Sequence, residues 1–167
     1  MKNTDLSPEQ SIKKVGELIK DIKFAMLCTT NPEGHLHSRP MTTQEDEFDG
    51  TLWFFTSKDS GIKNDLDSSS EVNLAYANPN GHSYVSICGT GSFVDDKAIK
   101  EKFWKPAYKA WFVEGLDDPK LTLLKVDAHH AQYWDTPSAV AYVLNLAKSV
   151  ITGKSYSAGD NQKVDLN

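Results

Sequence analysis

Arg39 is the only arginine in the 167-residue sequence, and it lies in a segment, 35–41, that alternates like a β-strand. Alternation places Arg39 on the same face as Met41 and opposite Pro40. Proline cannot donate to a strand ladder, so Pro40 marks an edge, a bulge or an opening of the sheet. An arginine beside an opening offers a planar fork of donors suited to phosphate or carboxylate. The alternative interpretation is an exposed arginine on the rim of a sheet.

A second candidate site lies over 55–63, where an expected strand runs into an expected helix. Thr56 and Ser60 supply hydroxyl groups there, and lysines on both sides of Ser60 supply ammonium groups. Helix N-termini bind phosphate because their backbone N–H groups are unpaired and the helix dipole is positive there. The same residue types also occur in solvated helix caps. Arg39 and Lys63 form one anion site only if the fold brings them together.

Metal and hydrolase chemistry have weaker support. His35-Leu36-His37 could present two ligands on one strand face, but the adjacent pair at 129–130 points to opposite faces, and no cysteine pair or HExxH motif accompanies either. A Ser-His-Asp hydrolase would need a GxSxG elbow, which the sequence lacks. Cys28 and Cys88 lie in apolar runs, so we expect buried, reduced thiols. We therefore predict no metal site.

The composition predicts one mildly acidic globular domain. The 18 Lys and Arg residues against 23 Asp and Glu residues give a formal net charge of −5, and 39% of residues are hydrophobic. Mixed charges of this kind argue against a nucleic-acid partner. The polar N-terminus has no apolar signal region, and no apolar run approaches the roughly 20 residues of a membrane span. We expect a cytoplasmic protein without a membrane partner.

The elements that must position these residues are an opening helix and a series of strands. The segment 7–10 has the pattern of a capping box with a first-turn proline, and apolar residues follow at helical spacing as far as Ile22. Further helices are expected at 60–66, after Asp95, and from Thr136 to about Val150. Strands are expected at 24–30, 35–43, 51–57, 71–78, 82–94, 121–126 and 128–134. Two Asn-Pro-x-Gly turns suit antiparallel hairpins, so the predicted fold is α+β, a meander curled into a small antiparallel barrel with flanking helices.

Taken in order, these motifs resemble the FMN-binding split-barrel superfamily related to pyridoxamine 5′-phosphate oxidase. The resemblance is carried by Ser38-Arg39-Pro40-Met41, by the segment 52–57 and by Ser60-x-x-Lys63. The segments 111–126 and 131–135 are similar to the general stress protein subgroup. The resemblance implies a split barrel of about six to seven strands. It also implies one FMN-binding domain over 1–154 and a homodimer with two equivalent FMN sites at the subunit interface. The polar residues that follow this domain predict a flexible C-terminal tail at 155–167.

Carried over by position, the resemblance implies roles for nine residues. Arg39 and Lys63 would bind the FMN phosphate, with help from Ser60 and Thr56. The backbone around Pro40 and Met41, together with Phe55 and Thr56, would contact the isoalloxazine and ribityl parts. Trp134 of the partner subunit would lie near the flavin, and Trp104 would contact its edge. FAD is an alternative to FMN.

One departure bears on activity. In the oxidases of the superfamily, the tryptophan at the position of Trp134 is followed by a motif that contains arginine and histidine and binds the substrate phosphate. Residues 135–142 of this sequence contain neither arginine nor histidine. A lysine could supply positive charge to a substrate phosphate, but not the planar pair of donors that an arginine guanidinium offers. The leading interpretation is therefore an FMN-binding general-stress-type flavoprotein, an oxidoreductase acting on an unidentified small molecule, with no catalytic residue assigned. The alternatives are a non-catalytic flavin-binding or flavin-sensing protein, then a pyridoxamine or pyridoxine 5′-phosphate oxidase, and finally a barrel without flavin.

Overall fold

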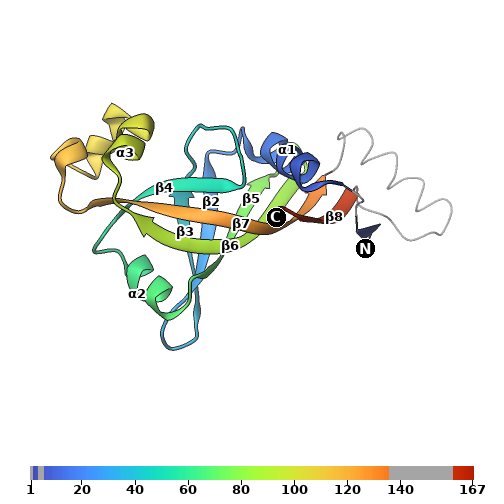
Figure 1. The fold of residues 1–167 in the computed structure, drawn as a ribbon, viewed down its shortest axis with the longest axis horizontal. Coiled ribbons are helices and arrows are strands. Elements are labelled where there is room, and N and C mark those ends of the chain that lie inside the picture. Colours follow the sequence, from blue (N-terminus) through green and yellow to red (C-terminus); the bar gives the residue numbers. More distant parts are fainter. Residues whose placement is uncertain (1, 4–5, 136–159) are drawn as a thin grey trace.

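Eight strands and three α-helices form the part of the chain that this computed structural model describes, residues 2–3, 6–135 and 160–167 (Figure 1). The strands are β1 (Lys2–Asn3), β2 (Phe24–Thr30), β3 (Leu36–Thr42), β4 (Thr51–Ser57), β5 (Glu71–Asn78), β6 (Ser83–Val94), β7 (Leu121–Asp135) and β8 (Asp160–Asp165). The helices are α1 (Pro8–Ile19), α2 (Gly61–Ser68) and α3 (Lys97–Phe103), with short 3₁₀ turns at Pro106–Ala110 and Gly115–Asp117.

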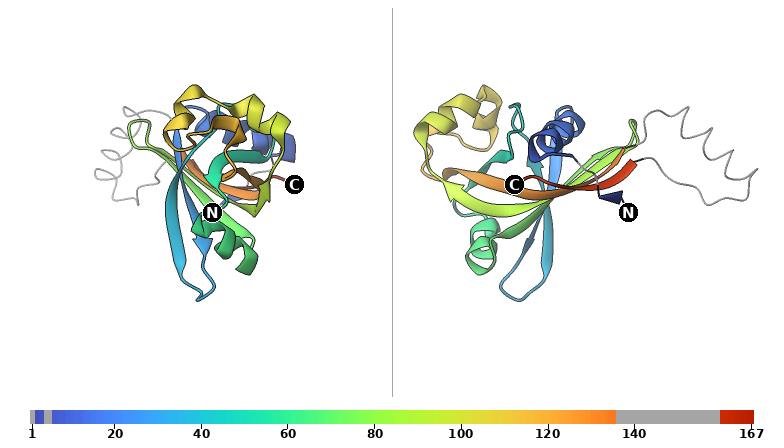
Figure 2. Two further views of the ribbon diagram at one scale, coloured as in Figure 1. Left: turned by 90° about the vertical axis from the view of Figure 1, so that its left-hand side faces the viewer. Right: turned by 45° about the vertical axis from the view of Figure 1, so that its right-hand side comes forward.

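Six strands curl into an open barrel in the order β4-β7-β6-β5-β2-β3, and every neighbouring pair is antiparallel. Within the described ranges no ladder joins β3 to β4, so the barrel is split between these two strands (Figure 2). The predicted α+β fold with an antiparallel split barrel and flanking helices is confirmed. Pro40 lies on β3, the strand at one edge of the split, where a residue without a backbone donor is tolerated.

Strand β7 corrects the prediction of two separate strands at 121–126 and 128–134. It is continuous because a β-bulge absorbs the irregularity: Cys88 pairs with His130 and Gly89 with Ala128, which leaves His129 as the extra residue. A Cβ on Gly89 would clash with the carbonyl oxygen of Asp127 across the bulge, so the strands can approach only because this residue is glycine.

Strand β8 corrects the expectation of a flexible tail for its last eight residues. Asp160–Asp165 pairs antiparallel with β7 and parallel with β1. Val164 and Leu166, two positions apart, are both buried and join the core cluster, which ties this segment to the barrel. The expected helix from Thr136 and the rest of the expected tail lie outside the described residues.

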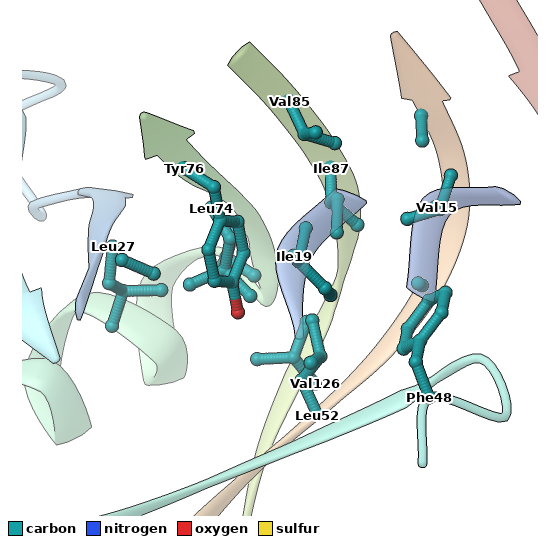
Figure 3. Close-up of a cluster of buried hydrophobic side chains, with 14 of the residues drawn as sticks. Val15, Ile19, Leu27, Phe48, Leu52, Leu74, Tyr76, Val85, Ile87 and Val126 are labelled. Atoms are coloured by element: carbon teal, nitrogen blue, oxygen red, sulfur yellow. The ribbon is translucent and has the colours of Figure 1, made fainter. Parts of the chain in front are cut away.

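Helix α1 packs over the barrel and covers the core. Its predicted capping box is present, since the Ser7 N–H donates to Gln10 Oε1 (3.0 Å) and the Gln10 N–H donates to Ser7 Oγ (3.3 Å). Val15 and Ile19, one turn apart, are buried and point toward the side chains of the sheet (Figure 3). None of the helices in the described ranges is long and apolar enough to cross a membrane.

Candidate functional site

The N-terminus of α2 lies beside Arg39 at one end of the barrel. A Cβ built on Gly61, the first residue of α2, would lie 3.8 Å from Nη2 of Arg39. Helix α2 packs next to the β2–β3 hairpin in every view (Figures 1 and 2). The sequence left open whether Arg39 meets the strand-to-helix segment 55–63. The structure brings them together.

The side chain of Ser60 leaves the N-terminus of α2 uncapped. Ser60 is the N-cap residue, but no side-chain hydrogen bond caps the helix. Its hydroxyl instead accepts a hydrogen bond from the hydroxyl of Thr56 (3.3 Å), which is almost fully buried. The first turn of α2 contains no acidic residue. An uncapped helix N-terminus with two hydroxyl groups and an arginine beside it is suited to bind an anion.

Two hydrogen bonds fix the guanidinium of Arg39. Nη1 donates to Oγ1 of Thr29 (2.7 Å), and Nη2 donates to Oδ2 of Asp65 (2.7 Å). The Thr29 hydroxyl donates in turn to the same Asp65 oxygen (2.6 Å). The Arg39 side chain is 26% exposed, so the alternative of an exposed arginine on a sheet rim is wrong.

Sequence reasoning missed Thr29 and Asp65. Burial raises the pKa of Asp65, but hydrogen bonds from Thr29 and Arg39 outweigh it, so the pKa lies below its ordinary value and the carboxylate is charged. One signal was available: Asp65 follows Ile62 by three residues on the buried face of α2, and Thr29 follows Leu27 by two on the buried face of β2. A polar residue at an apolar-face position usually has a buried partner.

Lys63 belongs to the same first turn of α2, but its side chain points elsewhere. Its Nζ contacts both carboxylate oxygens of Asp67, at 2.9 and 2.6 Å, one turn further along the helix. The Lys63 side chain is 54% exposed, and surface pairs of this kind contribute roughly 0–1 kcal/mol. No contact joins Lys63 to Arg39 in the described chain, but Lys63 can exchange its partner at little cost.

Four other residues predicted to contact the flavin lie in three different places: the outer face of the sheet, the core and an aromatic cluster. Pro40 is exposed on the outer face of β3, whereas Met41 is buried in the core. Phe55 lies on the face of β4 opposite Thr56 and packs against Trp104 and Tyr108, with ring centroids 5.8 and 5.0 Å away. The structure therefore gathers Arg39, Thr56 and Ser60 but not the side chains of Met41, Phe55 and Trp104.

Trp134 is remote from this site within one chain. Thr56 pairs with Thr122 near the start of β7, while Trp134 lies twelve residues further along the strand and pairs with Tyr84. At about 3.3 Å per residue the separation is roughly 40 Å along the strand. A single chain therefore does not place Trp134 beside Arg39.

The outer face of the sheet carries an apolar surface. Five residues of β2, β3 and β6 are exposed on it and define what we call the outer apolar surface: Phe24, Met26, Leu36, Pro40 and Tyr84. Met26 is the cross-strand partner of Pro40. Exposed apolar groups on one face of a sheet are typical of an interaction surface.

The two cysteines also point to the outer face of the sheet. Both are free thiols, but Cys88 is exposed and Cys28 is half-buried. The expectation of buried thiols is therefore wrong for Cys88. The reason is that its apolar run belongs to a strand that is covered on one face only, and Cys88 lies on the other.

The family model described as pyridoxamine 5′-phosphate oxidase like matches residues 10–157 of the chain. The chain belongs to this family. Among the proteins similar to this chain, the protein bli-3 of Neurospora crassa is 31% identical over 163 residues, which covers 91% of this chain and 78% of that protein. General stress protein 26 of Bacillus subtilis is 28% identical over 123 residues, covering 71% and 85%.

Solved structures of similar proteins have the same fold. The general stress FMN/FAD binding protein of Xanthomonas citri superposes with a TM-score of 0.68 at 32% identity, covering 78% of this chain and 92% of that one. General stress protein 26 of Bacillus anthracis superposes with a TM-score of 0.65 at 23% identity, covering 74% and 92%, which shows the shared fold alone. The resemblance to the general stress subgroup of the pyridoxamine 5′-phosphate oxidase-like family is confirmed.

Proposed function

We propose that this chain is a cytoplasmic flavoprotein that binds FMN noncovalently, with the phosphate at the N-terminus of α2. The observation that carries the proposal is the Arg39 guanidinium beside the uncapped first turn of that helix. Only two of its five N–H donors are used by Thr29 and Asp65. A phosphate placed there would accept hydrogen bonds from Arg39, from the hydroxyl of Ser60 and from backbone N–H groups, which is the donor set that phosphate prefers.

The other predicted flavin contacts follow from this placement. Lys63 would exchange Asp67 for the phosphate, since it is exposed and on the same turn of α2. The backbone at Pro40 and Met41, on the strand that borders the split, would contact the ribityl and ring parts together with Thr56. The bound flavin supplies the redox chemistry, while the protein binds and orients it. FAD is the alternative cofactor.

The proposed activity is that of an oxidoreductase acting on a small molecule. The second candidate is a protein that binds or senses flavin without turnover. It is favoured by the absence from the sequence of the arginine- and histidine-containing motif that would grip a phosphorylated substrate. For the same reason, oxidation of pyridoxamine 5′-phosphate ranks below both.

We also propose a homodimer that covers the outer apolar surface. Phe24 and Leu36 are 61% and 72% exposed, and a second copy of the chain would remove them from water. A two-fold interface would also bring Trp134 of one subunit toward the other, which one chain cannot do for its own Arg39. The two flavin sites would then lie at the interface.

FMN titration of the purified protein tests the proposed function. We expect quenching of FMN fluorescence with saturation at one FMN per chain, and anaerobic NADH or NADPH is expected to bleach the bound flavin if the protein is an oxidoreductase. Binding without bleaching by either donor would favour the flavin-sensing alternative. A protein that leaves FMN fluorescence unchanged at micromolar concentrations would contradict both.

Substitution of Met26 by lysine tests the dimer. Met26→Lys places a charge within the outer apolar surface, so we expect a monomer by sedimentation velocity and weaker FMN binding. Val113→Lys is the matched control, because Val113 is 80% exposed but lies outside this surface, between the two 3₁₀ turns. The proposal fails if Met26→Lys remains as dimeric as Val113→Lys.

A further inference from the structure

The contacts of Arg39 within its own chain are more specific than a phosphate anchor requires. A charged arginine could reach an anion at the α2 N-terminus as a mobile side chain. Here a buried carboxylate and a buried hydroxyl hold it instead, and they are bonded to each other. The side chain of Asp65 is 5% exposed and Thr29 is 1% exposed, so neither exchanges freely with water.

We propose that Asp65 and Thr29 are positioning residues that hold the Arg39 fork in the orientation in which it binds the phosphate of the ligand, an inference that rests on the proposed FMN site. Asp65 and Thr29 do not touch the ligand. They act through the guanidinium, which they hold against the first residue of α2.

The number of N–H donors on the Arg39 guanidinium supports these separate roles, in which Arg39 binds the phosphate and Asp65 and Thr29 position Arg39. A guanidinium has five N–H donors, and one on each terminal nitrogen is used by Thr29 or Asp65. The N–H of Nε and one on each terminal nitrogen stay available, and a bidentate contact to phosphate needs two. Because both inward contacts join Arg39 to buried residues of its own chain, the entropy of ordering a long side chain is lost on folding and not on binding.

The charges on α2 give this proposal a prediction that differs from simple electrostatics. Asp65 and Asp67 lie two residues apart on the same helix, and each is paired with a candidate phosphate ligand, Arg39 or Lys63. If charge alone mattered, removal of either carboxylate would tighten binding of an anionic ligand. If Asp65 positions Arg39, its removal weakens binding of that ligand, whereas removal of Asp67 does not.

The test compares FMN with riboflavin, which lacks the phosphate, by fluorescence titration of wild-type protein and three α2 variants. For Asp65→Ala we expect the preference for FMN over riboflavin to fall roughly 10- to 100-fold. Asp65→Asn keeps an oxygen that can accept from both Thr29 and Arg39, so it is expected to restore most of the preference. Asp67→Ala, the matched control, is expected to keep or increase it.

Substitution of Thr29 covers the case in which Asp65→Ala does not fold. Thr29→Val removes the hydroxyl that accepts from Arg39 and donates to Asp65, and we expect a roughly tenfold loss of the FMN preference. Thr29→Ser retains the hydroxyl and is expected to bind like wild type. Circular dichroism identifies any variant that is unfolded.

The outcomes separate this inference from the proposed function. A wild-type protein that binds FMN no better than riboflavin overturns the phosphate site itself. If wild type prefers FMN but Asp65→Ala and Thr29→Val keep that preference, the site stands and the positioning role is overturned. Equal tightening in Asp65→Ala and Asp67→Ala would also overturn it, because charge alone would then explain both.

Discussion

Replacement of Arg39 by alanine is expected to weaken FMN binding on the order of 100-fold, while riboflavin binding changes little. The reason is that only FMN carries the phosphate, and Arg39 is the sole residue in the sequence that can offer it a planar fork. Fluorescence titration of both ligands measures the difference. Equal losses for FMN and riboflavin would show that Arg39 supports the fold and not the phosphate.

Arg39→Lys is the control that separates charge from geometry. Arg39→Ala leaves the Asp65 carboxylate buried without its cation, and the loss of one partner of a buried pair can cost about 3–5 kcal/mol of the free energy of unfolding. Lysine retains a positive charge for Asp65 but lacks the fork. We therefore expect Arg39→Lys to fold more stably than Arg39→Ala and still to lose at least about tenfold in FMN binding.

Replacement of Phe54 by alanine is expected to lower the free energy of unfolding by about 3–5 kcal/mol. Phe54 is 0% exposed and lies opposite Leu124 on the pairing of β4 with β7. Strand β4 has β7 as its only ladder partner in the described chain, so side-chain packing contributes much of what holds it at the edge of the split. Urea unfolding without flavin, followed by circular dichroism, measures the change.

Phe54→Leu provides the comparison for the same position. It keeps most of the apolar volume, so we expect a loss smaller than about 1.5 kcal/mol. A loss below about 1 kcal/mol for Phe54→Ala would contradict the packing of β4 against β7.

Local chemistry was enough to predict most of the elements. The capping box at Ser7 and Gln10 sets the start of α1, because its two hydrogen bonds join residues three apart. The turn at Asn31 closes the β2–β3 hairpin through contacts within five residues, including Gly34 with a φ of 85°. Alternation then gave the two faces of each strand.

Elements that depend on distant partners were predicted less well. Local sequence suggested a break within β7, but pairing with β6, β4 and β8 keeps the strand continuous through its bulge. The segment from Asp160 looks like a polar tail until Val164 and Leu166 reach the core. In both cases long-range pairing supplies hydrogen bonds and buried area that no local pattern shows.

The sequence by itself determined that Arg39 and the segment 55–63 were the candidate phosphate ligands, because donor type, proline and helix-start chemistry are local properties. Only the tertiary structure decided that they meet, that Arg39 is held by Asp65 at 26 residues' separation, and that Phe55 packs against Trp104 and Tyr108. The physical reason is that hydrogen bonds and ion pairs depend on distances of about 3 Å. Such distances between remote residues are set by the packing of the barrel and not by the composition of any one segment.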